Sequence, residues 1–260
     1  MTVRDIANVI EEFAPLRLQE DYDNAGLQVG DPEATVNAVM LCLDVTMEVL
    51  EEAKRRQCDM IVSHHPLIFR GLKSLTGADE TQRIVMGALA AGVAIYAAHT
   101  NLDSAWNGVS HEMAHMLGLK NLSVLVPSQP GADTGLGVVG DVNPTPTLEF
   151  LRKVKEKFSV KALRYSTLSS KIVVKRVALC GGSGASFIRD AIAANADIYI
   201  TGDVKYHEFA GFGDNILIAD IGHYESELCS MKIFSRIIRQ QYPNLVVYFS
   251  EDQKSPIAVM

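Results

Sequence analysis

The fold is decided by a stretch of sequence that occurs twice, as VMLCLDVTMEVLEEAKRRQCDMIVSHH (39–65) and as VALCGGSGASFIRDAIAANADIYITGD (177–203). The second copy begins 138 positions after the first (177 − 39) and aligns without a gap, so that Cys42 falls on Cys180 and Asp59 on Asp197. Each copy is typical of an apolar strand, a helix and a second apolar strand that ends in polar residues. Because strands that alternate with helices indicate α/β architecture, the repeat predicts a duplicated α/β unit.

The rest of the chain extends this pattern into two halves. The segment PSQPGADTGLGVVGDVNPTPT (127–147) is rich in Gly and Pro, and it predicts loops and short strands between the halves. We therefore expect two related α/β domains, 1–126 and 127–260, which suits a length of 260 residues. At the N-terminus, Thr2 and Asp5 have the spacing of a capping box and predict a helix that begins there.

Composition excludes several classes of protein. The net charge of −7, from 24 basic and 31 acidic residues, does not suit a nucleic-acid partner, which requires clustered Lys and Arg. No apolar run approaches the 18 residues of a membrane-spanning helix, so no membrane partner is expected. The four cysteines form no C-x-x-C pair and no dense disulfide framework, which favours a cytoplasmic location.

Polar side chains gather where predicted strands end. Ligands of open α/β sheets bind at the carboxyl ends of the strands, and four loops are expected there: SHHP (63–66), HTNLD (99–103), TGDVKYHE (201–208) and GHYESE (222–227). These loops carry His64, His65, His99, Asp103, Asp203, His207, His223, Glu225 and Glu227. Five of the seven histidines of the chain are among them. The sequence therefore predicts one chemical site at this edge.

The residue types in these loops are ligands for transition metals. On a regular strand the side chains of His64 and His65 would point to opposite faces, but at a strand exit before Pro66 both can turn toward one site. Imidazole and carboxylate suit Zn, Mn, Fe or Co, and carboxylates can bridge the two ions of a hydrolytic centre. The alternative is that these histidines are ordinary polar residues of surface loops.

Two further motifs match known patterns but lack the right context. HEMAH (111–115) has the H-E-x-x-H form of a zinc protease, yet no convincing third ligand follows, and a solvated helix face is the favoured interpretation. GLGVVG (135–140) has the form of a dinucleotide-binding loop, but prolines follow it where a helix should begin. Neither motif is expected to carry function.

GGSG (181–184) leaves two interpretations open. The loop follows a predicted strand and precedes a predicted helix, so its backbone N–H groups could bind an anion such as phosphate. Alternatively, the loop is a tight strand-to-helix turn that needs small residues. The sequence alone does not decide between them.

Taken in order, the motifs of the chain resemble a known family. They are DNAGLQVG (23–30), SHHPLIF (63–69), AAHTNLD (97–103), GADTGLGVVG (131–140), CGGSG (180–184), TGDVKYHE (201–208) and GHYESE (222–227). Together they resemble the Nif-three-like dinuclear metal proteins, also called GTP cyclohydrolase I type 2 homologs, in the short form without an inserted central domain. The resemblance extends from the first helix to SEDQKSPI (250–257).

The resemblance implies two related α/β domains that face each other, with two divalent ions in the cleft between them. By motif, the metal ligands would be His64, His65, Asp103, His223 and Glu227. His99 and Asp203 would lie near the metals, and we expect His99 to move protons in catalysis. The ions would be Zn, Fe, Mn or Co, and the assembly a ring-like homohexamer built from dimers.

The expected function is metal-dependent hydrolysis of a nucleotide or a related heterocyclic or phosphorylated small molecule, in the manner of a GTP cyclohydrolase. Water activated between two metals could open a heterocycle. One alternative is a metal-binding regulator or adaptor without catalytic activity, which presents its surface to protein partners. Another is a metal-loaded scaffold that assembles or modifies a cofactor.

Overall fold

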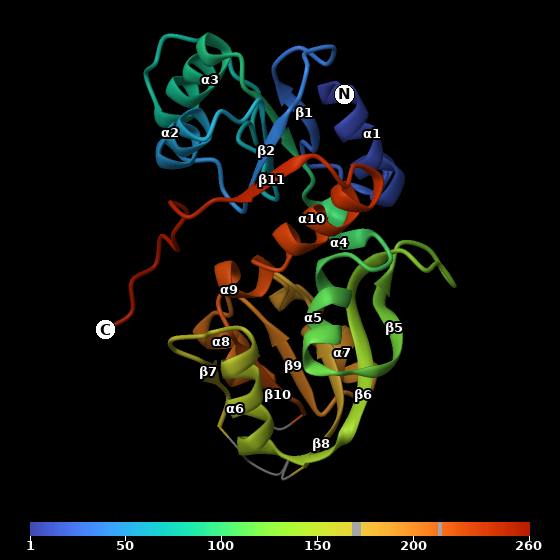
Figure 1. Cartoon of the computed structure of the whole chain (residues 1–260). Coiled ribbons are helices and arrows are strands. Elements are labelled where there is room, and N and C mark those ends of the chain that lie inside the picture. Colours follow the sequence, from blue (N-terminus) through green and yellow to red (C-terminus); the bar gives the residue numbers. More distant parts are fainter. Residues whose placement is uncertain (168–172, 213–214) are drawn as a thin grey trace. The chain divides into compact units, whose positions relative to one another are not determined.

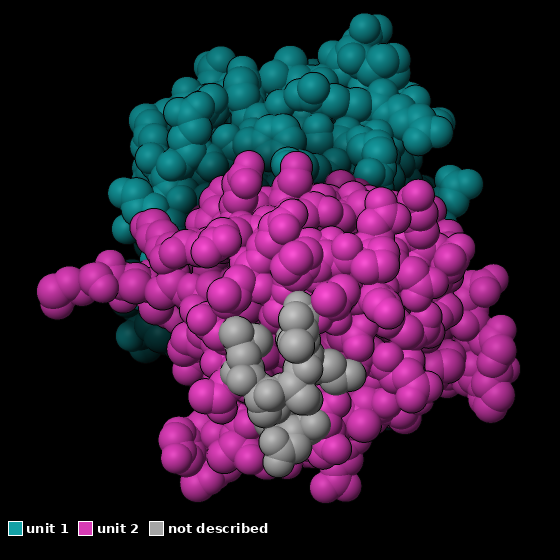
Figure 2. Space-filling model, turned by 90° about the horizontal axis from the view of Figure 1, so that it is seen from below, with its two compact units in different colours: residues 1–102, 230–256 teal, residues 103–229, 257–260 magenta. Residues whose placement is uncertain are grey.

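The computed structural model describes residues 1–167, 173–212 and 215–260, and its chain forms two compact units (Figures 1 and 2). Unit 1 consists of residues 1–102 and 230–256, and unit 2 consists of residues 103–229 and 257–260. Each unit contains one sheet with helices packed against it. The prediction of two α/β domains is therefore confirmed.

Unit 1 is built on a five-stranded sheet of order β1-β4-β3-β2-β11, in which only β1 runs antiparallel to its neighbour. Its strands are β1 (Gly26–Val29), β2 (Ala38–Cys42), β3 (Met60–Ser63), β4 (Ala94–Ala97) and β11 (Val246–Phe249). Its helices are α1 (Val3–Phe13), η1 (Leu16–Leu18), α2 (Met47–Arg55), α3 (Glu80–Ala91) and α10 (Ser230–Gln241). The core packs the apolar faces of α2 and α3 against the sheet.

Unit 2 is built on a six-stranded mixed sheet of order β5-β6-β8-β9-β10-β7. Its strands are β5 (Lys120–Pro127), β6 (Gly135–Pro146), β7 (Arg164–Tyr165), β8 (Val173–Leu179), β9 (Ile198–Thr201) and β10 (Leu217–Asp220). Its helices are α5 (Val109–Leu117), α6 (Thr147–Lys157), η2 (Ala185–Phe187), α7 (Ile188–Ala193), α8 (Tyr206–Phe212) and α9 (His223–Glu227). The division between the units falls within the short helix α4 (Thr100–Ser104).

The sequence repeat corresponds to the same strand pairing in both units. Val39 pairs with Met60 in unit 1, and Val177 pairs with Ile198 in unit 2, so both pairs keep the offset of 138 positions (177 − 39 and 198 − 60). A side-chain contact repeats as well. Asp59 Oδ2 accepts the N–H groups of residues 37 and 38, and Asp197 Oδ2 accepts those of residues 175 and 176. Because both the strand register and this carboxylate contact are repeated, duplication of one unit is favoured over a chance similarity between two α/β units.

The units differ in their bounds from the expected halves 1–126 and 127–260. In Figure 1 the C-terminal elements α10 and β11, in red, lie beside the N-terminal elements of unit 1, in blue. β11 pairs in parallel with β2, from Val246 opposite Ala38 to Phe249 opposite Leu41, and α10 packs on α1. The C-terminal residues therefore belong to unit 1. Their strand β11 covers β2, which would otherwise be an unpaired edge of the sheet.

Several local expectations are confirmed. Thr2 and Asp5 form the predicted capping box of α1, and the helix begins where the sequence placed it. Two expectations differ from the structure. The Gly- and Pro-rich segment is not mainly loop, since β6 runs over twelve residues, and the helix after GGSG is a 3-10 turn followed by only six α-helical residues. Among the described ranges, no helix has both the length and the apolar composition that crossing a membrane requires.

Candidate metal centre

Three histidines come together at the carboxyl ends of two neighbouring strands in unit 1. His64 and His65 follow β3 directly, and His99 follows β4. One ring nitrogen of each lies within 4.8 Å of those of the other two, and the ring centroids are 5.2–5.4 Å apart. This is a group that could hold a metal ion. It lies where the sequence predicted chemistry.

Each of these imidazoles bonds through Nδ1 to an acceptor in unit 1. The pairs are His64 with the Ala98 carbonyl (2.9 Å), His65 with Asp44 Oδ1 (2.7 Å) and His99 with Asp23 Oδ1 (2.8 Å). A metal-ligating histidine almost always donates its second ring N–H to a carboxylate or carbonyl, which fixes the tautomer and the ring orientation. In a metal site of this kind, Nδ1 is bonded to an acceptor and Nε2 is directed to the ion. The three Nδ1 partners therefore fit a metal site.

Asp23 is the first functional residue that sequence reasoning missed. Its carboxylate accepts His99 Nδ1, the backbone N–H of Thr100 (3.0 Å) and the Thr100 hydroxyl. Burial raises the pKa of Asp23, but the hydrogen bonds from His99 and Thr100 outweigh it and hold the pKa well below its usual range. Asp23 is the first residue of the DNAGLQVG motif, and its place in that motif was the only sign in the sequence of a functional role.

Asp44 is the second missed residue. It follows β2 at the same sheet edge as His65, which is the signal that could have identified it. The N–H of the preceding residue, Leu43, donates to Oε1 of Gln253 (2.8 Å), just beyond β11. A residue near the end of the chain therefore holds the backbone next to the acid that orients His65.

The segment 250–253, here called the C-terminal strap, is fixed by a buried carboxylate of α2. Glu52 accepts the Ser250 hydroxyl (2.6 Å) and the N–H groups of Glu251 (3.0 Å) and Asp252 (3.1 Å), and it pairs with Arg56 (2.9 Å). Burial raises the pKa of Glu52, but these hydrogen bonds lower it further than burial raises it. The strap is therefore held as an ionic and hydrogen-bonded unit.

Unit 2 places His223 and Glu227 on one turn of α9. His223 Nε2 lies 3.0 Å from Glu227 Oε2, and its Nδ1 bonds to Asp203 Oδ2 (2.8 Å). Asp203 has a φ of +55°, a left-handed conformation that Asp tolerates better than most residues, at the loop after β9. His223 therefore has the same carboxylate support at Nδ1 as His65 and His99 have in unit 1.

The GGSG loop supports Glu227 and uses its N–H groups internally. Three of these groups donate to side chains of unit 2: Gly181 to Ser110 (3.3 Å), Gly182 to Ser226 (2.9 Å) and Gly184 to Thr201 (2.9 Å). Gly182 has a φ of +62°, and a Cβ there would overlap Glu227 Oε1. These contacts favour the tight-turn interpretation over anion binding, because three of the four backbone donors of the loop are occupied and the missing side chain of Gly182 makes room for a carboxylate.

Asp103 lies on α4, four residues after His99. Burial, followed by the charges of Asp103 and Glu227, raises the pKa of the Cys180 thiol to about 12. The same two carboxylates raise the pKa of Cys229, after burial and Glu112. Asp103 and Glu227 are thus near the same two thiols in unit 2. The sequence predicted loops for both acids, whereas the structure has them on the short helices α4 and α9 that follow the strands. The sequence gave no indication that cysteines lie near them.

Other candidates from the sequence lie elsewhere. His207 contacts Tyr206 on α8, with ring centroids 5.3 Å apart, and the Glu225 carboxylate lies over Gly222. GLGVVG lies within strand β6, which excludes a dinucleotide-binding turn. Among the described residues, no group of three possible metal ligands includes a histidine of HEMAH.

The prediction that HEMAH is a solvated helix face is wrong for His111. The helix α5 forms as expected and His115 is exposed, but His111 is only 2% exposed and lies against Trp106, with ring centroids 4.3 Å apart. Burial, with a smaller contribution from the charge of His115, lowers the pKa of His111 to about 4. His111 is therefore a neutral core histidine.

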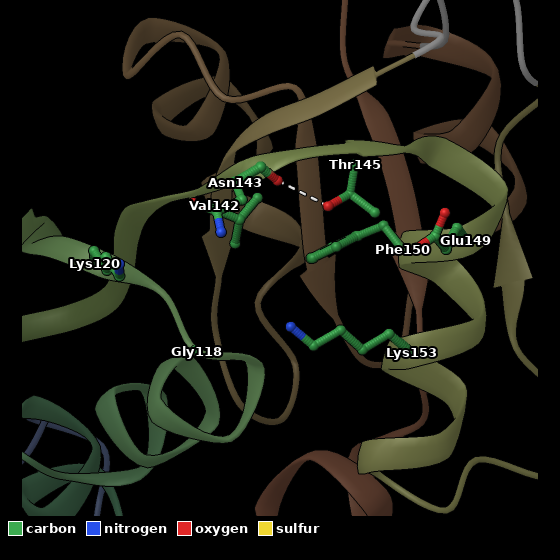
Figure 3. A pocket seen from close by; sticks show the side chains of 8 residues that line it. All are labelled: Gly118, Lys120, Val142, Asn143, Thr145, Glu149, Phe150 and Lys153. Carbon is green, nitrogen blue, oxygen red and sulfur yellow. Dashed lines mark hydrogen bonds between the residues drawn. The ribbon is translucent and has the colours of Figure 1, made fainter.

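Unit 2 also has a cavity of about 260 Å³ whose lining contains no histidine or cysteine (Figure 3). It is lined by Gly118, Lys120, Val142, Asn143, Thr145, Glu149, Phe150 and Lys153. Lys153 Nζ donates to the Leu117 carbonyl (2.6 Å), and the Thr145 hydroxyl donates to the Asn143 carbonyl (2.8 Å). None of these residues belongs to the predicted site.

Comparison with known proteins agrees with the motifs. A family model described as Duf34/NIF3 (NGG1p interacting factor 3) matches residues 1–256. A Clostridium acetobutylicum protein named GTP cyclohydrolase 1 type 2 homolog is 36% identical over 239 residues, which cover 91% of this chain and 89% of the relative. A Schizosaccharomyces pombe protein named Protein NIF3 homolog is 32% identical over 236 residues, with 85% and 83% covered. The crystal structure of Staphylococcus aureus protein SA1388 is similar with a TM-score of 0.89, at 26% identity and with 100% and 99% of the two chains covered.

Proposed function

This chain belongs to the Duf34/NIF3 (NGG1p interacting factor 3) family, and from that premise we propose that it binds two divalent metal ions and hydrolyses a nucleotide or a related small molecule. The observation that supports this best is the histidine group of unit 1, in which all three Nδ1 atoms are already bonded to acceptors. Histidines that serve only as surface residues do not need such support. The relatives named GTP cyclohydrolase 1 type 2 homolog make a nucleotide the first substrate to test.

In this proposal both units contribute ligands. The ligands would be His64, His65, Asp103, His223 and Glu227. Two divalent ions would supply Lewis-acid activation of water for hydrolysis. Asp44 and Asp203 would hold the rings of His65 and His223 with Nε2 directed to the metals. Gly182 would keep open the space that the Glu227 carboxylate needs.

His99 is assigned to proton transfer, with Asp23 holding its Nδ1 proton so that Nε2 exchanges protons with the reacting groups. Because His99 also lies within the histidine group of unit 1, the His99→Gln variant distinguishes its roles. Full metal content with lost turnover supports proton transfer. Loss of metal instead assigns His99 to the ligand set.

Elemental analysis of the purified protein tests the metal proposal. We expect about two equivalents of metal per chain, and a sharp drop in both His64→Ala and Glu227→Ala, with Glu225→Gln as the matched control on α9. Nucleotides, cyclic nucleotides and phosphoesters are then tested with Mn, Fe or Zn for turnover that Glu227→Ala removes. Metal without turnover on any substrate would favour the adaptor function, which the family description as an interacting factor suggests.

We further propose that the protein is a cytoplasmic homohexamer built from dimers. The cysteine pattern is the basis for the location and the family alone is the basis for the assembly, which light scattering after size-exclusion chromatography tests. A mass of six times 28.4 kDa is expected. A monomeric mass would overturn the assembly and leave the metal proposal intact.

A further inference from the structure

We propose that Tyr22 and Phe69 form a stacking subsite beside the histidine group of unit 1, and that this subsite binds the planar heterocycle of a nucleotide. The inference deepens the proposed function, on which its choice of a nucleotide rests. It concerns residues of unit 1 only. It assigns a binding role to two aromatic side chains that are neither metal ligands nor supports of the ligands.

Both rings are exposed, and Tyr22 lies beside Phe69, which in turn lies beside His99. Tyr22 is 63% exposed and Phe69 is 44% exposed. Their ring centroids are 6.4 Å apart, and the Phe69 centroid is 6.4 Å from that of His99 in an edge-to-face arrangement. These distances fall within the range in which aromatic rings interact. A substrate held at the histidine group therefore lies next to exposed aromatic surface.

Hydrogen bonds fix the backbone that carries the two rings. Asn24 Nδ2 donates to the Ile68 carbonyl (2.6 Å), the Ile68 N–H donates to Gln28 Oε1 (2.9 Å), and Gln28 Nε2 donates to the Asn24 carbonyl (2.6 Å). The residue before Phe69 is thereby tied to the segment that follows Tyr22. Surfaces that are ordered before a ligand arrives lose less entropy on binding.

Asp23 links the same segment to the histidine group. It is the neighbour of Tyr22 in the chain, and its carboxylate bonds to His99 Nδ1 (2.8 Å). The position of Tyr22 relative to the histidines is therefore set by a short buried contact rather than by a free loop. Asp23 thus couples orientation of His99 to placement of an aromatic ring.

The chemistry of the surroundings favours a heterocycle that carries phosphate. Nucleobases have polar edges and a π-face, which suits a site of exposed aromatic rings next to imidazoles. Arg70 and Lys73 carry the only charges of segment 66–78, and both are positive in a chain of net charge −7. A sugar or an aliphatic phosphoester could use these cations but would gain nothing from stacking.

The test measures equilibrium binding without turnover. Metal-free protein, prepared with a chelator, is dialysed against guanosine, guanosine 5′-monophosphate or ribose 5-phosphate. We expect Phe69→Leu and Tyr22→Leu to weaken binding of the nucleoside and the nucleotide about tenfold each, the effect of one lost base stack. Leu keeps apolar bulk and removes the π-face, whereas Phe69→Tyr should restore binding. Ribose 5-phosphate should bind all variants equally.

Tyr206→Leu serves as the control, because Tyr206 is 78% exposed on α8 of unit 2. Unchanged nucleoside affinity in Phe69→Leu would overturn the subsite, and so would an equal loss of affinity for ribose 5-phosphate. Elemental analysis of the same variants keeps the two proposals apart. Protein that binds metal normally but shows no effect of Phe69→Leu refutes only the subsite. Protein whose nucleoside affinity falls in Phe69→Leu but which holds no metal as purified refutes only the metal-dependent function.

Discussion

The buried imidazole of His111 makes stability depend on pH. A histidine in an unfolded chain has a pKa near 6.5, whereas burial lowers the pKa of His111 to about 4 in the folded protein. Between these values the unfolded state binds a proton that the folded state excludes, so stability rises with pH. The contribution of the neutral ring is full above pH 6.5 and is lost as the pH falls toward 4.

Urea unfolding at pH 7.5 and pH 5.0 measures this effect. We expect the free energy of unfolding to be about 2 kcal/mol smaller at pH 5.0 on account of His111 alone. Trp106 is the single tryptophan of the chain and lies against the imidazole, so its fluorescence reports the transition. The His111→Leu variant should lose this part of the pH dependence, and His115→Leu, at an exposed position of the same helix, should retain it. Equal pH dependence in both variants would contradict the assignment.

A single methyl group at Gly182 should displace the Glu227 carboxylate. The added Cβ would overlap Glu227 Oε1, and the φ of +62° is unfavourable for alanine by about 1–2 kcal/mol. We expect Gly182→Ala to weaken metal binding at least tenfold, measured by titration with a chromophoric chelator as competitor. Gly211→Ala is the matched control, since a Cβ there meets nothing within 4 Å and α8 tolerates alanine. Parent-like affinity in Gly182→Ala would show that Glu227 is not a ligand.

Among the elements, the C-terminal strap follows β11 and contacts the chain just after β2. Gln253 accepts the N–H of Leu43, and the next residue, Asp44, orients His65. Loss of an outer partner of a metal ligand typically lowers affinity 10–100-fold. We expect Gln253→Leu to lower the affinity for Zn or Mn about tenfold, at the lower end of that range because Gln253 acts through the backbone.

Two further variants test whether the effect is specific to the side chain of Gln253. Gln253→Glu keeps an oxygen acceptor for the Leu43 N–H and should restore affinity, and Lys254→Ala, at an exposed neighbour, should leave it unchanged. The cobalt-substituted protein adds a spectroscopic readout, since its visible absorption changes when His65 moves. If Gln253→Leu binds metal and absorbs light as the parent does, the strap has no role at the site.

How far the sequence predicts this molecule depends on the range of the contacts. The repeat defines β2, α2 and β3 and their counterparts in unit 2, because apolar strands and helical spacing are local signals. The exits of β3, β4 and β10 locate the four histidines His64, His65, His99 and His223. Asp23 and the pairing of β11 with β2 depend on contacts across 76 residues and across most of the chain. No local pattern encodes such pairs, which is why the expected halves differ from the observed units.

At the scale of the whole molecule, the proposal that both units supply ligands to the metals predicts that metal binding links the stabilities of the two units. Bound metal stabilises the folded state by mass action, by about 2.7 kcal/mol at a metal concentration 100 times the dissociation constant. In hydrogen exchange we expect Zn or Mn to protect peptides around His65 in unit 1 and around His223 in unit 2. Glu227→Ala should reduce protection in both units, while Glu225→Gln should not. Full protection of unit 1 in Glu227→Ala would mean that each unit binds metal independently.

The return of α10 and β11 to the first sheet has a consequence for biosynthesis. Residues 103–229, which hold nearly all of unit 2, form an uninterrupted segment, whereas unit 1 needs residues 230–256 to cover β2. A ribosome therefore releases everything required for the second unit while the first, although translated earlier, still has an open strand edge. Unit 1 is therefore the first unit to be translated and the last to complete its sheet. Until β11 pairs with it, β2 is the strand edge most exposed to mispairing with another nascent chain.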